Sequence, residues 1–92
     1  MPLTATQRVE QIRQVLTARL APVELLIRDD SAAHAGHAGA REGGHFSVLV
    51  VSAQFEGRTR MQRHQLVYAA VAELMRTDIH ALSIQARTPQ EP

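Results

Sequence analysis

Five histidines stand out in a chain of 92 residues that contains no cysteine. His34, His37 and His45 lie close together in the sequence, whereas His64 and His80 come later. Imidazole nitrogens bind transition metals and change charge near neutral pH, so gathered histidines can form a metal site or a pH sensor. They can equally form a hydrogen-bonded polar edge without a chemical role. The choice depends on which histidines the fold brings together.

The other residue types limit the kind of metal site. No His-x-x-x-His pair and no cysteine accompany the histidines, which argues against a closed structural zinc site. A 2Fe-2S centre can take two histidines on one iron, but its other iron requires thiolates. An iron-sulfur cluster on this chain would therefore be shared with a partner that donates sulfur.

A second group suited to ligand binding is the basic run Arg58, Arg60, Arg63 and His64. Guanidinium groups and backbone donors at the start of a helix suit phosphate, so this run is a candidate nucleic-acid contact. All ten basic residues of the chain are arginine, and with nine acidic residues the net charge is only +1, which does not predict a strongly nucleic-acid-binding surface. The alternative is a solvated face that caps its helix or pairs with Glu56.

The acidic residues give no support to catalysis. Glu56, Glu73 and Asp78 lie on separate segments, and neither a Gly-x-Ser-x-Gly nucleophile motif nor a Gly-x-x-x-x-Gly-Lys phosphate loop occurs. Asp29 and Asp30 are adjacent, and neighbouring strand residues point to opposite faces. The sequence therefore predicts a binding protein rather than an enzyme.

Two segments have the apolar periodicity of amphipathic helices. The sequence from Thr4 to Gln7 is a capping box, and the apolar stripe after it runs until Pro22 disfavours helical geometry. The sequence from Thr59 to Gln62 is a second capping box, and its stripe runs to about Arg76. These boundaries predict one helix in each segment.

Three segments have the pattern of strands: residues 23–28, 45–52 and 80–86. The second is nearly continuous in apolar residues, as expected of a central strand covered on both faces. Residues 31–44 between the first two hold four of the five glycines and predict a mobile loop. The side chains expected to face the core are Val23, Leu25, Ile27, Leu82, Ile84 and Ala86.

The element order αββαβ predicts an α+β sandwich in which two helices pack on one face of a three-stranded mixed sheet. The first two strands should be antiparallel, and a right-handed helical crossover makes the third parallel to the second. His80 then lies at the sheet end that also carries His34, His37 and His45, with His64 apart on its helix. The length predicts one domain over residues 1–92, with an ordered core of about residues 5–88.

The composition also bears on location. No apolar run approaches the roughly 20 residues that cross a bilayer, and the first residues lack a basic region followed by an apolar one. The absence of cysteine suits a reducing compartment. A cytoplasmic protein without membrane contact is therefore expected.

Several short motifs occur in a specific order and spacing along the chain. They are Ser31-Ala32-Ala33-His34, His45-Phe46, Phe55-Glu56-Gly57, Arg63-His64, Val67-Tyr68 and His80-Ala81-Leu82. In combination they resemble the BolA family, and the resemblance extends from about Val9 to Thr88. The family's fold is a KH-like αββαβ arrangement, which agrees with the periodicity.

The resemblance implies a non-enzymatic partner of a monothiol glutaredoxin, in a heterodimer that holds a bridging 2Fe-2S cluster. Glutaredoxin cysteine and glutathione would supply the thiolates, and this chain would supply His80 and His34. His37 competes for the loop position, and His45 is expected beside the cluster or at the strand edge rather than as a ligand. The implied role is iron and redox signalling or cluster trafficking. The isolated chain is expected to hold no cluster and to be a monomer or weak homodimer.

The resemblance also leaves a DNA-binding transcriptional regulator as the alternative, acting through the basic run. KH domains clamp nucleic acid with a Gly-x-x-Gly loop, and the sequence from Gly57 to Arg60 lacks the second glycine. The three aromatic rings, Phe46, Phe55 and Tyr68, fall at positions that can be core, which gives base stacking little support. Any DNA binding should be modest and strongly salt-dependent.

Overall fold

The two longer helices begin where a threonine and a glutamine cap each other. The computed structural model describes residues 4–30 and 44–91. In α1 (Ala5–Leu20), the Thr4 hydroxyl accepts the Gln7 N–H at 3.1 Å and the Gln7 side chain accepts the Thr4 N–H at 2.9 Å. The same reciprocal pair, Thr59 and Gln62, caps α2 (Arg60–Ala70). Both predicted helix starts are confirmed, because each box satisfies two backbone donors at the exposed end.

The second helical segment is not continuous, contrary to the prediction of one helix to about Arg76. Val71 leaves helical geometry, with φ −104° and ψ 12°, and separates α2 from the six-residue α3 (Ala72–Thr77). The Val71 N–H still bonds to Val67 and the Met75 N–H to Val71, so the bonding continues through the distortion. The side chain of Val71 is fully buried. The two helices are therefore joined through one buried residue whose backbone is not helical.

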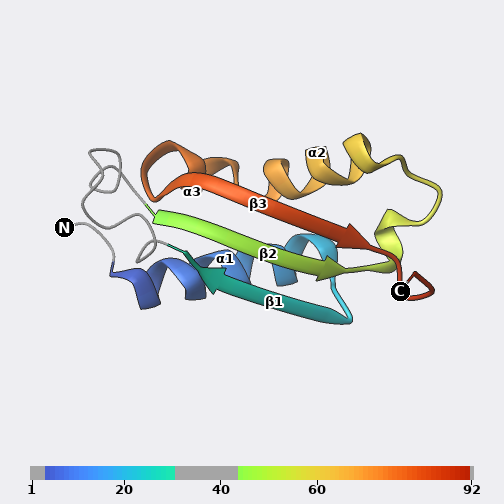
Figure 1. The fold of residues 1–92 in the computed structure, drawn as a ribbon, viewed down its shortest axis with the longest axis horizontal. Coiled ribbons are helices and arrows are strands. Elements are labelled where there is room, and N and C mark those ends of the chain that lie inside the picture. The colour runs from blue at the N-terminus through green and yellow to red at the C-terminus, as the bar shows by residue number, and fades with distance from the viewer. Residues whose placement is uncertain (1–3, 31–43, 92) are drawn as a thin grey trace.

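The sheet has the order β1-β2-β3, built from β1 (Glu24–Asp29), β2 (Gly44–Val51) and β3 (Ile79–Arg87). β1 and β2 are antiparallel, and β2 and β3 are parallel, as predicted. Between β2 and α2 the chain makes the short 3-10 helix η3 (Ala53–Phe55) and turns at Gly57, whose φ of 75° suits glycine. This mixed topology puts the starts of β2 and β3 at one end of the sheet (Figure 1).

The helices bury one face of the sheet. Phe46, Val48 and Val50 of β2 are buried, whereas the residues between them are only partly buried. The expectation that β2 is covered on both faces is therefore wrong, although its central position is right. The apolar residues of this strand form both a buried face and a half-covered open face. Composition alone does not distinguish this arrangement from a strand covered on both faces. In Figure 1 the sheet lies in front of α1, with the open face toward the viewer.

The core includes the aliphatic stripe of α1, the buried face of β2 and residues of α2, α3 and β3. Leu25, Ile27 and Ile84 pack against it, as predicted. Val23 does not: it precedes β1 and is 71% exposed, although its N–H already donates to the Val51 carbonyl at 2.8 Å. Inside the core, the Ser52 hydroxyl donates to the Leu20 carbonyl at 2.6 Å and so ties the end of β2 to the end of α1.

Candidate functional site

His45 is the second residue of β2, and its position is fixed by backbone bonds from both neighbouring segments. The Asp30 N–H donates to the His45 carbonyl at 2.7 Å, and the Gly44 N–H donates to the Asp78 carbonyl at 3.1 Å. The side chain is on the open face, one residue before the buried Phe46. The start of β2 is therefore anchored to both edge segments at the level of His45.

His80 reaches the same face through a break in the strand register. Gly44 pairs with Ile79 and His45 pairs with Ala81, so His80 is an extra residue in β3. The burial pattern agrees, because Ile79 and Leu82 are buried while His80 and Ala81, which lie between them, are both exposed. Strict alternation would have turned His80 toward the core with Leu82. The β-bulge turns its imidazole outward instead.

The two rings lie side by side, with centroids 5.0 Å apart and planes tilted by 42°. Two imidazoles that share one tetrahedral metal ion have centroids about 5 Å apart, because each metal–nitrogen bond is about 2.0–2.1 Å long. The spacing of His45 and His80 therefore fits joint ligation of one iron. Their rings come from residues 35 positions apart in the sequence. The predicted convergence at this sheet end is confirmed for this pair.

The remaining predicted ligands are not placed. His34 and His37 lie outside the described residues. Within residues 4–30 and 44–91, no group of three or more His, Cys, Asp or Glu side chains is arranged to hold a metal ion. The pair alone offers two nitrogen ligands, so a complete centre requires ligands from the segment 31–43 or from another molecule.

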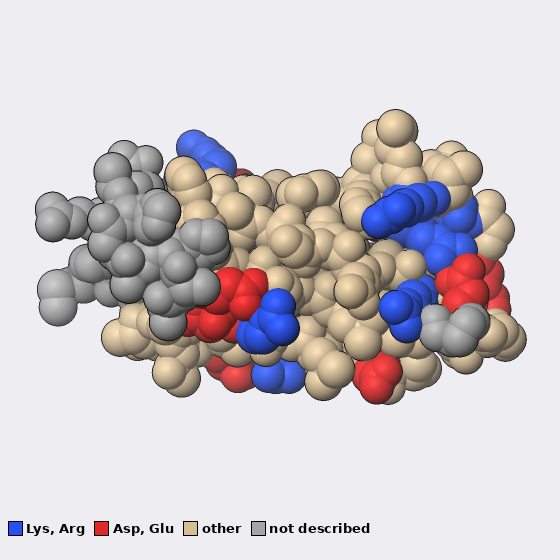
Figure 2. Space-filling model, viewed as in Figure 1, with Lys and Arg blue, Asp and Glu red and all other residues tan. Residues whose placement is uncertain are grey.

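The predicted basic run forms one wall of a pocket at the opposite end of β3 from the histidine pair. The pocket has a volume of about 600 Å³ and lies between the start of α2 and the last residues of β3. Figure 2 shows several Lys or Arg side chains close together at this end of the molecule, next to a wide area of the face without charged residues. The side chains that line the pocket include Arg58, Arg60, Arg63 and His64, together with Arg87 and Glu91. The four predicted residues are thus brought together, and apart from His80.

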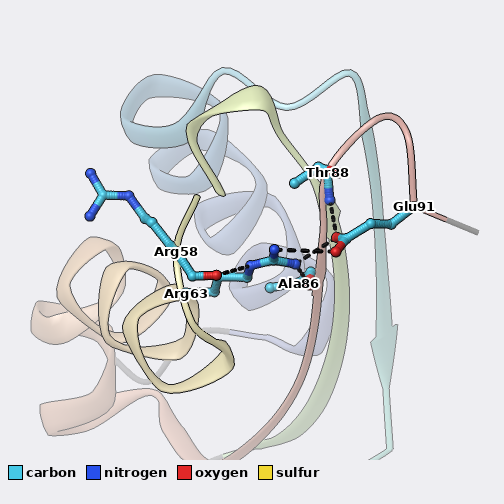
Figure 3. A network of polar contacts seen from close by, with 5 residues as sticks. All are labelled: Arg58, Arg63, Ala86, Thr88 and Glu91. Atoms are coloured by element: carbon cyan, nitrogen blue, oxygen red, sulfur yellow. Dashed lines mark hydrogen bonds and ion pairs between the residues drawn. The ribbon is translucent and has the colours of Figure 1, made fainter. Parts of the chain in front are cut away.

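Arg63 differs from the other three because its guanidinium is held by several partners (Figure 3). It donates to the carbonyls of Arg58 and Ala86 at 3.1 and 3.2 Å. It also forms a two-pronged ion pair with the Glu91 carboxylate, at 2.6 and 3.2 Å. Its side chain is only 14% exposed. Arg63 therefore pairs with Glu91, not with Glu56, and links α2 to β3 and to the segment after it.

Sequence reasoning missed two members of the pocket, Arg87 and Glu91. Arg87 extends β3 one residue beyond the predicted strand end, and strand continuation there depends on pairing with Val51. Glu91 belongs to a polar tail without periodicity, so only the fold reveals its contact with Arg63. The Thr88 N–H also donates to this carboxylate, at 2.7 Å.

These contacts change the acidity of Glu91. The Arg63 hydrogen bond is the largest cause, followed by the bond from the Thr88 N–H, and together they lower the pKa of Glu91 from 4.5 to about 2. A carboxylate with a depressed pKa stabilises the fold fully above the unfolded pKa and loses this effect as pH falls toward the folded pKa. The ion pair should therefore be intact at neutral pH and absent in strong acid.

We expect Glu91→Gln to lower the free energy of unfolding by a constant amount above about pH 5, and by an amount that shrinks to zero between pH 4.5 and about 2. Urea unfolding of both proteins across this range measures the difference directly. Groups that titrate in both proteins cancel in the comparison. A difference that stayed the same down to about pH 2 would show that the ion pair is not its source.

Comparison with known proteins bears on the family. Residues 16–91 match the family model of the BolA-like protein. The chain belongs to the BolA family. Among BolA relatives, Protein BOLA2 of Arabidopsis thaliana is 43% identical over 83 residues, which cover 89% of this chain and 80% of the relative. The DNA-binding transcriptional regulator BolA of Escherichia coli is 37% identical over 82 residues, covering 89% of this chain and 76% of the relative.

Solved BolA structures agree with the fold. BolA1 from Arabidopsis thaliana superposes with a TM-score of 0.79 at 43% identity, covering 92% of this chain and 96% of that one. The BolA domain of SufE1 from the same plant gives 0.83 at 41% identity, covering 98% and 99%. The predicted family and α+β fold are thus confirmed.

Other BolA relatives are longer than this chain. The chloroplastic BOLA1 of Arabidopsis thaliana is 46% identical over 91% of this chain, and the human BolA-like protein 1 is 48% identical over 87% of it. The chain spans just over half the length of each of these two relatives. The matching family model is named for BolA-like proteins, and the Escherichia coli relative is named a transcriptional regulator. Within the described residues, no helix is long and apolar enough to span a membrane.

Proposed function

We propose that this BolA-family protein is the histidine-bearing half of a 2Fe-2S centre shared with a monothiol glutaredoxin. The observation that carries the proposal is the His45–His80 pair, whose centroid spacing of 5.0 Å suits two ligands of one iron. The chain contains no cysteine, so the thiolates come from the glutaredoxin cysteine and from glutathione. The role that follows is iron and redox signalling or cluster trafficking.

The contribution of this chain is to present imidazoles at a fixed place on a rigid sheet. The bulge turns His80 to the open face, and the ladder bonds at Gly44 and Asp30 hold His45 beside it. A 2Fe-2S cluster carries one electron at a time, and histidine in place of thiolate raises its reduction potential. The expected second ligand on the loop, His34 or His37, competes with His45 for the position next to His80.

Reconstitution with the partner tests this function. The chain, a monothiol glutaredoxin, glutathione, ferrous iron and sulfide are mixed anaerobically, then separated by gel filtration with visible absorption recorded. We expect a coloured one-to-one heterodimer. The control contains every component except this chain. If the colour elutes only with the glutaredoxin homodimer in both mixtures, the proposed function is wrong.

Nucleic-acid binding is the second candidate function, and the arginine-lined pocket favours it. Arg58, Arg60 and Arg87 surround a cavity that is wide enough for a phosphate, and His64 adds a fourth donor. The relative from Escherichia coli is named a DNA-binding transcriptional regulator. A modest affinity that falls steeply with added salt is expected, because the net charge is only +1.

The cytoplasmic location expected from the sequence stays a prediction.

A further inference from the structure

The arginine-lined pocket already contains an anionic group that belongs to the chain itself. The Glu91 carboxylate is bound by both terminal nitrogens of Arg63 and by the Thr88 N–H. Figure 3 shows the Glu91 carboxylate next to the Arg63 guanidinium and to Thr88, while the Arg58 side chain points away from this network. Two parallel N–H···O bonds to one guanidinium are how arginine recognises carboxylates and phosphates alike. Glu91 thus occupies the place that an anionic ligand would take.

The guanidinium of Arg63 is held in place independently of Glu91. Its Nε–H donates to the Arg58 carbonyl, and one terminal nitrogen also donates to the Ala86 carbonyl. These bonds fix the plane of the guanidinium, so removal of the carboxylate leaves its two terminal nitrogens oriented toward the pocket. A preformed fork binds an incoming anion with little loss of side-chain freedom.

The surrounding cations are available to a second anion. Arg60 and Arg87 line the same pocket, and within the described residues neither forms an ion pair with a carboxylate. His64 lines it from α2. One internal carboxylate therefore faces Arg63, while at least two further guanidinium groups border the cavity. This excess of positive charge suits a ligand with more negative charge than a carboxylate.

We propose that this pocket binds a phosphate group and that Glu91 is its internal competitor. The proposal rests on the second candidate function where the phosphate belongs to a nucleic-acid backbone, and it holds for free phosphates independently of that function. Phosphate that displaces Glu91 gains the fork of Arg63 in addition to Arg60 and Arg87. The segment after β3 is released at the same time, because Glu91 is also the acceptor of the Thr88 N–H.

Binding of two probes to the whole chain and to Glu91→Gln tests the proposal. The probes are a fluorescein-labelled 12-base-pair duplex, measured by anisotropy, and pyrophosphate, measured by calorimetry. The Arg63–Glu91 ion pair is partly exposed, with side chains 14% and 42% exposed. A pair of this kind weakens a competing ligand by roughly two- to fivefold, so we expect Glu91→Gln to bind both probes tighter by that factor at low salt. In the wild-type protein, pyrophosphate should also shift the amide signal of Thr88 in NMR spectra.

Glu56→Gln is the matched control, because it removes one negative charge from the turn before Arg58 without removing a contact of Arg63. Tighter binding by Glu91→Gln but not by Glu56→Gln supports the proposal. Equal tightening of binding by both variants, or no tightening by either, overturns the proposal. If the duplex also binds all three proteins equally, nucleic-acid binding is retained and the role of Glu91 as competitor is rejected. Pyrophosphate binding that responds to Glu91→Gln without any duplex binding supports the pocket and rejects the nucleic-acid function. No binding of either probe to any variant rejects both.

Discussion

Replacing His80 with alanine is expected to abolish the histidine-dependent visible spectrum of the glutaredoxin complex while the fold stays intact. The imidazole is exposed and lies beside the ring of His45, so its removal leaves no cavity in the core. An exposed substitution of this kind changes the free energy of unfolding by about 0.5 kcal/mol or less. In the proposed centre, by contrast, the substitution removes one of the two imidazole ligands that this chain offers to the iron. Visible circular dichroism of the reconstituted complex and urea unfolding of the free chain measure the two effects.

Two further histidine variants make the result specific. His64→Ala changes a histidine on α2 that lines the arginine pocket, and its complex should keep the wild-type spectrum. His45→Ala tests the partner ring: a spectrum lost in this variant identifies His45 as the second ligand, whereas a spectrum kept in it assigns that place to His34 or His37. An unchanged spectrum in His80→Ala itself would contradict the shared centre.

Phe55→Ala is expected to lower the free energy of unfolding by about 3–5 kcal/mol. Phe55 is the last residue of η3, and its ring is fully buried in the core. The substitution therefore leaves a cavity as well as removing apolar contacts. Since a domain of this size is stable by about 5–15 kcal/mol, the variant should lose a large part of its stability. Urea unfolding followed by far-ultraviolet circular dichroism gives the value.

The matched control for Phe55→Ala is Met61→Ala, which removes a large apolar side chain that is 71% exposed on α2. Its effect should stay near 0.5 kcal/mol, because the methionine is mostly in water in both states. A loss of stability below about 1 kcal/mol in Phe55→Ala would show that the surrounding core closes around the missing ring.

The carbonyl of Phe55 also accepts the Arg58 N–H at 3.2 Å, so loosening of this turn should weaken phosphate binding in the Phe55 variant.

Features that depend on neighbouring residues in the sequence were predictable. Capping boxes placed the starts of α1 and α2, and alternation placed Leu82 and Ile84 on the core face of β3. The parallel pairing of β2 and β3 followed from the helical crossover between them, which returns the chain to the end of the sheet where β2 begins. These rules are local or topological, so they were sufficient to predict that His45 and His80 meet at one end of the sheet.

Features that depend on tertiary contacts were not predictable. The bulge at His80 appears only in the pairing with β2, and the break between α2 and α3 falls at Val71, whose side chain is buried in the core. The wrong orientation assigned to Val23 has the same origin, because alternation does not show where a strand begins. Tyr68, at a position that can be core, is 42% exposed and donates to the Leu82 carbonyl at the sheet edge.

The backbone bonds that flank the segment between β1 and β2 bear on how the chain tolerates insertions. The Asp30 N–H is bonded to His45 and the Gly44 N–H to Asp78, so both ends of the intervening sequence are tied to the ladder itself. Closing a longer loop costs only about 0.6 kcal/mol for each doubling of its length. The number of residues between Asp30 and Gly44 can therefore vary widely among homologous proteins without moving His45 relative to His80. Loop length and histidine geometry are free to evolve separately.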